Sequence, residues 1–419
     1  VARWSAGLIM ALSVAAGLLY FRHPYKIGID SPPLRLVLMG IDGLAALPVL
    51  YYCIRYRRYL TALLGLLQFG LIVAFEFHAG SYARSVWDFN IDNLAIIMIL
   101  IAGIIGGLIA IYSLGYMAVF HRKHLDVKDR RSFFFFVVFL FLSAMFGLVM
   151  SNNLLYMYTF WEITSLCSFL LIGYTGTNEA IHNSFKALWM NLLGGLAFAM
   201  AIAYLGTHFY TLELSQLLSL GMQQMPVEPV VALLVFCGFT KSAMMPFSGW
   251  LLGAMVAPTP TSALLHSSTM VKAGVFLIIK LAPILGNNHA GIMAMLVGGI
   301  SFFFASCAAI SQSDGKKVLA YSTISNLGLI VCCAGTGSYE AAWTAIMIVI
   351  FHAVAKSLLF LTVGTAEQQL GSRNRESFHG IFNSMPPLSL CMVIGICGMF
   401  LAPFGMLIAK WAAMQPSLD

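Results

Sequence analysis

Charged side chains are scarce in this sequence. Asp, Glu, Lys and Arg make up 9% of the 419 residues, whereas 60% are hydrophobic, and the mean hydropathy is +0.88. Soluble globular chains carry about 25% charged residues, so this composition excludes that class. It predicts a polytopic membrane protein.

Redox and nucleotide-binding motifs are also missing. The eight cysteines lie nearly all inside apolar runs, and none of their spacings matches CxxC, iron–sulfur or zinc ligation. Gly315, Lys316 and Lys317 lack the upstream glycine and the following Ser or Thr of a P-loop, and no GxGxxG follows a strand. We therefore expect no cofactor in this chain. If it pumps ions, the energy comes from a gradient or from partner subunits.

Long hydrophobic runs fill the chain instead. A helix needs about 20 residues to cross a hydrocarbon layer of about 30 Å. By that rule we predict an all-α fold, a polytopic transmembrane bundle of about thirteen helices. The runs are 3–21, 34–53, 59–77, 93–118, 133–150, 154–174, 184–206, 229–256, 262–285, 289–310, 317–335, 339–364 and 385–413. The first run is long and lacks a small-residue cleavage signature, so we expect a membrane helix there and not a signal peptide.

Basic residues predict the orientation. They collect in the even-numbered loops, whereas the loop around Glu213 and Glu228 is acidic. The positive-inside rule then places the even loops and the N-terminus in the cytoplasm. The same cations explain the net charge of +7 without nucleic acid as a partner, because they face anionic lipid headgroups. The basic loop residues are Arg55, Arg57, Arg58, Arg122, Lys123, Lys128, Arg130, Arg131, Lys316, Lys317, Arg373 and Arg375.

Ionisable residues nevertheless recur inside the apolar runs. Each charge at membrane depth costs at least about 2.5–3.5 kcal/mol, so a series of them indicates a path for ions. The same residues can carry H⁺ or support Na⁺ exchange. The series is Glu162, Lys186, Lys241, His266, Lys272, His352, Lys356 and Lys410.

Two prolines predict broken helices beside lysines of this series. Pro246 follows Lys241 by five residues, and Pro403 precedes Lys410 by seven. Proline removes a backbone hydrogen bond, and transporters build ion sites where a helix is interrupted. The alternative is that both prolines only kink packed helices.

Glu162 needs a cationic partner from another helix, and Lys186 in the next run is the nearest candidate. Such a pair would hold both groups charged, and its loss would favour their neutral forms, which is a way to load and release a proton. The alternative is a structural ion pair, which would fix how the two helices pack. Lys186 also lies near a membrane end, where its ammonium group can snorkel.

His352 and Lys356 are spaced i, i+4 and share one helix face, an arrangement suited to a proton relay. His266 and Lys272 are six residues apart and do not share a face of a regular helix. The hydroxyl groups between them could carry a water chain. His266 is alternatively a satisfied polar contact, and a histidine pair could ligate haem.

Four segments give the chain a family resemblance. WEITSLCSFLLIGY, FTKSAMMPFSGWLLGAMVAPTPTSALLHSSTMVKAG, DGKKVLAYSTISNLGLI and FHAVAKSLLFLTVG resemble the antiporter-like membrane subunits of respiratory complex I, multisubunit Na⁺/H⁺ antiporters and energy-converting [NiFe] hydrogenases. The resemblance runs from the FNIDNL segment at residue 89 to the last residue. It implies two inverted five-helix repeats, each with a broken helix, joined by a hydrophilic axis in the membrane plane.

The resemblance also implies roles. Glu162 matches the family's helix-borne glutamate, Lys241 its broken-helix lysine, Lys316 its central lysine and Lys410 the exit-side charge. His266 and Lys272 match the following helix, and His352 and Lys356 the connecting pair. It divides the chain into N-terminal helices at 1–131, a first repeat at 132–285 and a second repeat at 286–419. One hydrophobic run is extra at the start, and the second repeat is expected to be incomplete at residue 419.

LLHSSTMVKAGVFLIIKLAP and APFGMLIAKW look most like the hydrogenase branch. We therefore predict a proton- or sodium-translocating subunit of a redox-driven complex in a prokaryotic cytoplasmic membrane. Its partners would be other membrane subunits and a peripheral redox arm, which would hold the [NiFe] and iron–sulfur clusters. The alternatives are a complex I subunit, a stand-alone Na⁺/H⁺ antiporter subunit, and a scaffold whose charges are structural.

Overall fold

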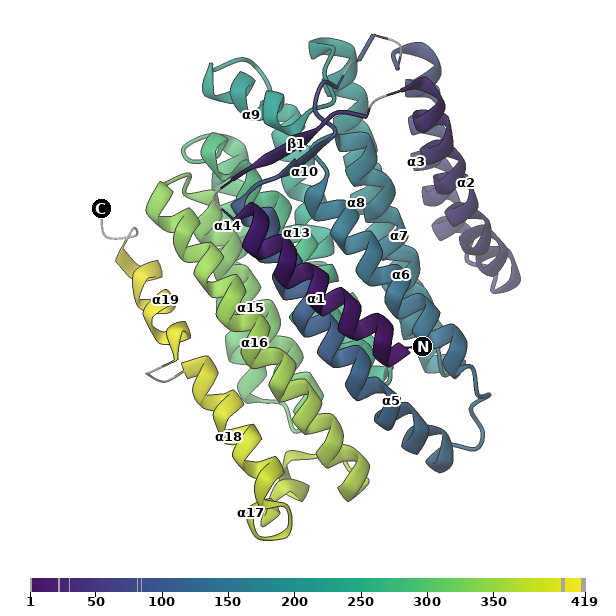
Figure 1. Cartoon of the computed structure of the whole chain (residues 1–419), viewed down its shortest axis with the longest axis vertical. Coiled ribbons are helices and arrows are strands. Elements are labelled where there is room, and N and C mark those ends of the chain that lie inside the picture. The colour runs from purple at the N-terminus through teal and green to yellow at the C-terminus, as the bar shows by residue number, and fades with distance from the viewer. Residues whose placement is uncertain are drawn as a thin grey trace.

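The computed structural model of the chain is almost entirely helical, which confirms the all-α prediction (Figure 1). It describes residues 2–21, 23–29, 31–80, 82–83, 85–400 and 404–415. Within these residues the strands are β1 (Tyr25–Ile27) and β2 (Phe89–Ile91), which pair antiparallel with Tyr25 opposite Ile91. This short ribbon joins the first and fourth membrane spans at one end of the bundle.

The N-terminal half of the chain supplies the first seven spans. Asn93 to Lys123 forms one continuous span in which a π-helical turn, η1, separates two α-helical parts. The elements are α1 (Ala2–Tyr20), α2 (Pro32–Arg55), α3 (Tyr59–His78), α4 (Asn93–Leu100), η1 (Ile101–Ile105), α5 (Gly106–Lys123), α6 (Arg131–Met150), α7 (Leu154–Ile172), α8 (Asn178–Phe209) and the short α9 (Leu214–Met222).

The C-terminal half contains several short, interrupted helices beside the long α14, α15 and α16. Its elements are α10 (Glu228–Lys241), α11 (Gly249–Gly253), the 3-10 turn η2 (Ala254–Val256), α12 (Thr259–Ser267), α13 (Met270–Leu281), η3 (Ala282–Ile284), α14 (His289–Ile310), α15 (Gly315–Gly335), α16 (Tyr339–Leu370), η4 (Arg375–Phe378), α17 (Ile381–Ser384), α18 (Pro386–Phe400) and α19 (Gly405–Met414).

Twelve helical segments of the described chain are long and apolar enough to cross a membrane, against the thirteen runs expected. The difference is the run at 229–256. This run does not form one helix, because α10 ends at Lys241 and the chain is not helical again until Gly249. Too few consecutive helical residues remain for a full span.

Polar caps fix where several spans begin. Asp92 accepts a hydrogen bond from the Ala95 amide at 2.9 Å, and Asn153 accepts one from Leu155 at 3.0 Å. Asp314 accepts from the amides of Lys316 and Lys317 at the start of α15. These side chains satisfy amide groups that have no partner inside the helix.

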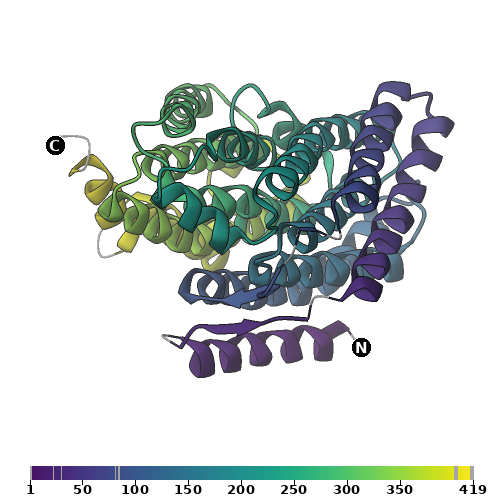
Figure 2. The same cartoon turned by 90° about the horizontal axis from the view of Figure 1, so that it is seen from above.

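The helices form a row that runs across the bundle. The α2–α3 hairpin packs on α7 and α8, α8 packs on α10, α10 on α13, and α16 on α12, α15, α18 and α19. In Figures 1 and 2 the hairpin and the C-terminal helices α18 and α19 lie at opposite edges of the molecule. Helix α1 lies apart from this row and packs on α4 and α5.

Burial identifies the centre of the row. Nearly every residue of α12 and α13 is buried, including His266 and Lys272. The outer helices instead expose large apolar side chains, among them Leu18 on α1, Phe77 on α3 and Phe303 on α14. Apolar outer surfaces of this kind suit contact with lipid. The ionisable side chains of the central helices face protein and not the bilayer.

Candidate functional site

Lys241 is the last residue of α10 and is completely buried. Its ammonium Nζ donates to the Trp161 carbonyl oxygen at 2.9 Å and to Ser165 Oγ at 2.7 Å. The Nζ atom also lies 4.9 Å from the centroid of the Trp161 ring. The helix end therefore presents the lysine to α7, and residues 242–248, which include Pro246, form a non-helical link to α11.

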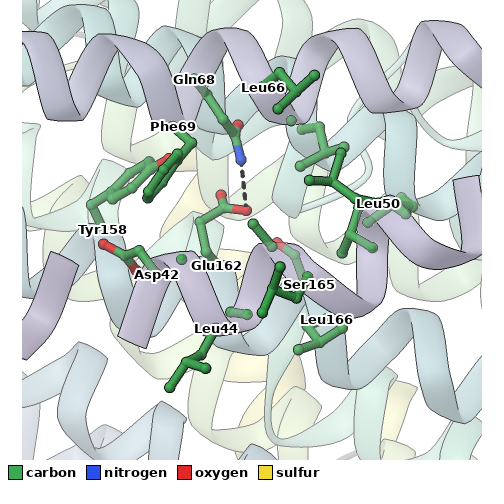
Figure 3. Close-up of a pocket in the computed structure, with 18 of the residues that line it drawn as sticks. Asp42, Leu44, Leu50, Leu66, Gln68, Phe69, Tyr158, Glu162, Ser165 and Leu166 are labelled. Atoms are coloured by element: carbon green, nitrogen blue, oxygen red, sulfur yellow. Dashed lines mark hydrogen bonds between the residues drawn. The ribbon is translucent and has the colours of Figure 1, made fainter. Parts of the chain in front are cut away.

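Glu162 lies on the same face of α7 as Ser165, because the two residues are three positions apart. Gln68 of α3 donates its Nε2 hydrogen to Glu162 Oε2 at 3.0 Å (Figure 3). Glu162 and Ser165 both line a cavity of about 430 Å³ between α2, α3, α7 and α8. Ser165 therefore connects the cavity with Lys241, whose ammonium group donates to the Ser165 hydroxyl.

A second carboxylate lines this cavity. Asp42 of α2 accepts a hydrogen bond from Thr159 Oγ1 at 3.0 Å, and Figure 3 shows it beside Glu162. Asp42 is 6% exposed. The sequence analysis missed Asp42, although the signal was the same as for Glu162, a single acidic residue inside an apolar run.

The structure does not bring Lys186 to Glu162, so the pairing predicted from the sequence is wrong in this respect. Lys186 lies in the first turns of α8 and lines cavities near the helix ends together with Arg57 and Lys317. Its ammonium group lies near Gly249 of α11. Adjacent spans in the sequence are not obliged to put their charges at the same depth, and the α3 helix occupies the place beside Glu162.

His266 and Lys272 lie on either side of an interruption that the sequence analysis did not predict. Helix α12 ends at Ser267 and α13 begins at Met270, so the two side chains belong to different helices. Lys272 Nζ lies 2.9 Å from His352 Nδ1 of α16. Both are fully buried. The structure thus brings Lys272 to His352, a contact that the sequence did not predict.

His352 and Lys356 lie one turn apart on α16, as their spacing predicts. Lys356 Nζ donates to the Leu319 carbonyl oxygen of α15 at 2.9 Å and contacts Ser322 Oγ. One turn further, the Phe360 ring packs on the His266 ring, with centroids 4.8 Å apart. Helix α16 therefore brings the four ionisable side chains of α12, α13 and α16 into one buried cluster.

Lys316 lies elsewhere, at the first turn of α15, and it is paired. Its Nζ is 3.0 Å from Glu367 Oε2, and Glu367 Oε1 accepts a hydrogen bond from Arg373 Nε at 2.5 Å. Thr259 Oγ1 also donates to this carboxylate at 3.2 Å. Glu367 was missed in the sequence because it stands near a helix end, where a charge is unremarkable.

Lys410 lies on α19, which packs on α16 at the far edge of the row. It is half-buried, with Nζ 3.4 Å from the Met399 carbonyl oxygen and 5.0 Å from the centroid of the Phe400 ring. Pro403, the second predicted helix break, lies outside the described residues. Helix α18 ends at Phe400 and α19 begins at Gly405.

The groups brought together are ammonium groups, imidazoles and carboxylates, whose common chemistry is proton exchange. Among the described residues, no three His, Cys, Asp or Glu side chains gather closely enough to hold a metal ion. The described residues thus form a helix bundle that buries ionisable groups and in which one helix is broken beside such a group.

Comparison with known proteins gives the family. Residues 151–419 match the family described as NADH:quinone oxidoreductase/Mrp antiporter, TM, and residues 77–126 match the N-terminus of chain 5 of NADH-ubiquinone oxidoreductase (complex I). The chain belongs to this NADH:quinone oxidoreductase/Mrp antiporter family of membrane subunits, which confirms the resemblance seen in the sequence.

Curated relatives include two putative antiporter subunits mnhA2. The protein from Staphylococcus haemolyticus is 37% identical over 332 residues, which cover 74% of this chain and 40% of the relative. The protein from Staphylococcus aureus is 36% identical over 337 residues, with 76% and 41% covered. The chain thus spans about two fifths of the length of these relatives.

Two solved structures share the fold. The Mrp complex from Dietzia sp. DQ12-45-1b matches with a TM-score of 0.66 and 25% identity, over 98% of this chain and 45% of that chain. The membrane-bound sulfane sulfur reductase, an archaeal respiratory membrane complex, matches with a TM-score of 0.70 over 92% of this chain and 82% of that chain. The second match is 22% identical and speaks for the fold alone.

Proposed function

We propose that this chain translocates protons or sodium ions as an antiporter-like subunit of a multisubunit membrane complex. One observation carries the proposal: ionisable groups follow one another along the row of helices, from the half-buried Glu162 and the buried Lys241 through the buried α12–α16 cluster toward the half-buried Lys410. Such groups are expensive at membrane depth and are retained where ions move.

The contact between Lys272 and His352 supports proton transfer. A hydrogen bond of 2.9 Å needs one donor and one acceptor, so the two nitrogens cannot both be fully protonated. Either Lys272 is an ammonium group that donates to a neutral imidazole, or the imidazole donates to a neutral amine. A proton that arrives at one group can therefore be handed to the other.

Buried hydroxyl groups support a hydrated connection around this pair. Thr261, Ser262 and Ser268 have side-chain oxygens that find no hydrogen-bond partner within the described residues. Buried polar atoms are normally satisfied, and ordered water often does so. Ser268 lies at the break between His266 and Lys272, where the sequence predicted a water chain, and Thr261 and Ser262 lie earlier on α12. The other hydroxyl groups of that stretch, Ser267 and Thr269, donate to the backbone carbonyl oxygens of Ala263 and Leu264.

Two observations bear on what would drive the proposed ion transport. The curated relatives named above are putative antiporter subunits, which favours an assembly that works as an antiporter. The motifs of α13 and α19 favour the hydrogenase branch, in which a peripheral arm with [NiFe] and iron–sulfur clusters would drive the transport. Copurification of such a redox subunit with the full-length protein from a prokaryotic cytoplasmic membrane would favour this branch.

Transport by the full-length complex in proteoliposomes tests the proposal. Glu162→Gln and Lys241→Met should each lower pH-driven ion exchange by roughly 100-fold, the lower range for a positioned proton-transfer group. Lys317→Met is the matched control, because Lys317 is exposed beside the buried Lys316. If both site variants transport normally but assemble poorly, the charges are structural and the scaffold alternative holds.

A further inference from the structure

The α2–α3 hairpin contributes polar groups of its own to the cavity at Glu162. Asp42 lies on α2 and Gln68 on α3, and both are about 95% buried. Within the described residues, Asp42 Oδ1, Gln68 Oε1 and Glu162 Oε1 have no hydrogen-bond partner. All three residues line the same cavity, and Figure 3 shows Gln68 reaching toward Glu162 with Asp42 nearby. Three oxygen atoms that can accept a hydrogen bond are therefore available to one proton or ligand in this cavity.

The geometry around Gly195 of α8 shows that two of these oxygens converge. A Cβ atom placed on Gly195 would lie 2.5 Å from Gln68 Oε1 and 2.5 Å from Glu162 Oε1. The two acceptors are therefore no more than about 5 Å apart by this construction. Both oxygens approach the same bare stretch of α8 backbone, which only glycine permits.

Within the described residues, neither carboxylate forms an ion pair within 4.0 Å, although the charge of the buried Lys241 still acts on Glu162. The nearby Lys241 ammonium group is directed to the Trp161 carbonyl oxygen and Ser165 Oγ, and it makes no ion pair within 4.0 Å. Two carboxylates in one apolar cavity repel each other, so a state in which at least one is protonated is favoured. This cavity therefore suits a proton that is shared between Asp42 and Glu162.

Polar groups continue from Asp42 toward one end of the bundle. Arg35 lies seven residues before Asp42 on α2, which is about 10 Å along the helix axis. Its guanidinium group donates to the Gly80 carbonyl oxygen at 2.6 Å and lies 3.9 Å from Glu76 Oε1 of α3. Arg35, Asp42 and Glu76 line a small second pocket next to the cavity.

We propose that Asp42 is a proton-binding residue that exchanges protons with Glu162 and connects this end of the path with the Arg35 and Glu76 end of the bundle. The inference rests on the proposed function. In each step the Asp42 O–H bond breaks as the Glu162 O–H bond forms, so the negative charge passes to Asp42. No electrons are exchanged with another group, and no redox partner is needed.

Few other charged or titratable groups face Asp42. Its own helix contributes Arg35, α3 contributes Glu76, and α7 contributes Glu162 and Tyr158. Helix α8 presents only apolar side chains and glycine to this part of the cavity. Glu162 is therefore the acidic neighbour of Asp42 in the cavity, and Glu76 is its acidic neighbour in the small pocket.

Carbodiimide labelling of the full-length complex in membranes tests the proposal directly. Dicyclohexylcarbodiimide is an apolar reagent that adds to protonated carboxyl groups and leaves a stable adduct that mass spectrometry locates. We expect adducts on Asp42 and Glu162 whose yield falls as the pH rises. Glu340, an exposed carboxylate at the start of α16, is the matched control and should stay unlabelled.

Variants separate a proton site from its alternatives. Asp42→Asn should abolish the Asp42 adduct and lower transport by roughly 100-fold, whereas Asp42→Glu, which keeps a titratable group, should restore both. Absence of an Asp42 adduct at every pH overturns the proposal. Protection by Na⁺ but not by choline at fixed pH overturns it too, because the site then holds a metal cation.

The two hypotheses fail separately. If the wild-type complex shows no ion exchange while Asp42 is labelled in a pH-dependent way, the proposed function is wrong and the proton site stands. If wild-type exchange is intact and Asp42→Asn exchanges at the wild-type rate, the inference about Asp42 is wrong and the proposed function stands. Asp42→Glu guards against misreading a folding defect.

Discussion

Two buried lysines of this chain have opposite surroundings. Lys316 is fully buried, and its ammonium group pairs with Glu367, which Arg373 also contacts. Lys272 is equally buried, but no carboxylate lies within 4.0 Å of its ammonium group among the described residues, and its partner is the imidazole of His352. The first lysine is charge-balanced and the second is not.

We propose that this difference separates a structural lysine from one that carries protons. A buried ion pair keeps both members charged, so a lysine held in this way has little freedom to release its proton. A lysine that shares a hydrogen bond with a neutral base has no such restraint. We therefore expect Lys316 to fasten the end of α15 to α16, and Lys272 to carry protons, although the family resemblance gives both a place in the path.

The largest expected effect is on transport at Lys272. Lys272→Met removes the group that exchanges a proton with His352, so ion exchange in proteoliposomes should fall roughly 100-fold. The unfolding midpoint should not fall, because methionine leaves no buried charge without a partner. Lys317→Met provides the control. A variant that unfolds more easily yet transports normally would make Lys272 structural, and the contrast with Lys316 would disappear.

The next effect is on stability at Glu367. Glu367→Gln leaves the buried Lys316 ammonium group without its counter-charge, and breaking a buried pair in this way costs about 3–5 kcal/mol. Thermal unfolding of the detergent-solubilised full-length protein should show the loss. The double variant Lys316→Met with Glu367→Met should recover most of it. An unchanged unfolding midpoint in Glu367→Gln would show that the pair does not hold the helices together.

The smallest effect extends the comparison to an exposed ion pair. Asp129, in the loop between α5 and α6, accepts hydrogen bonds from Arg131. These hydrogen bonds and the positive charge of Arg131 lower the pKa of the Asp129 carboxyl. A lowered pKa means that the pair stabilises the fold at neutral pH and loses this contribution as the pH falls through the folded-state pKa. The contribution is small because water screens exposed charges.

Unfolding measured against pH checks this point. Asp129→Asn should leave stability at neutral pH nearly unchanged and remove a slight decline in the acid range. A loss as large as that of Glu367→Gln would contradict the idea that burial decides how much a pair contributes.

Much of the fold was predictable from composition and run length. The membrane class, the helical fold and nearly every span follow from apolar runs of about 20 residues, since lipid allows few other structures. The run at 229–256 was counted as one helix, yet the same analysis placed a break beside Lys241, where α10 does end. The break between His266 and Lys272 was missed, because Ser268 and Thr269 carry no proline or glycine signal.

The candidate site was predictable in its members but not in its contacts. Ionisable residues in apolar runs are visible in any sequence, so Glu162, Lys241, Lys272 and His352 could be named in advance. The partner assigned to Glu162 was wrong because nearness in sequence was used in place of nearness in space. Asp42 carries the same signal as Glu162, a single acidic residue inside an apolar run, and was overlooked.

The sequence by itself determined that this chain lies in a membrane, that it is helical and that charges are buried within it, because apolar content and the expense of buried charge are properties of the residues alone. Only the tertiary structure decided which charges meet. It set Gln68 and Asp42 beside Glu162, His352 beside Lys272 and Glu367 beside Lys316. The reason is physical: contacts between helices depend on how their faces pack, and segments far apart in the chain supply those faces.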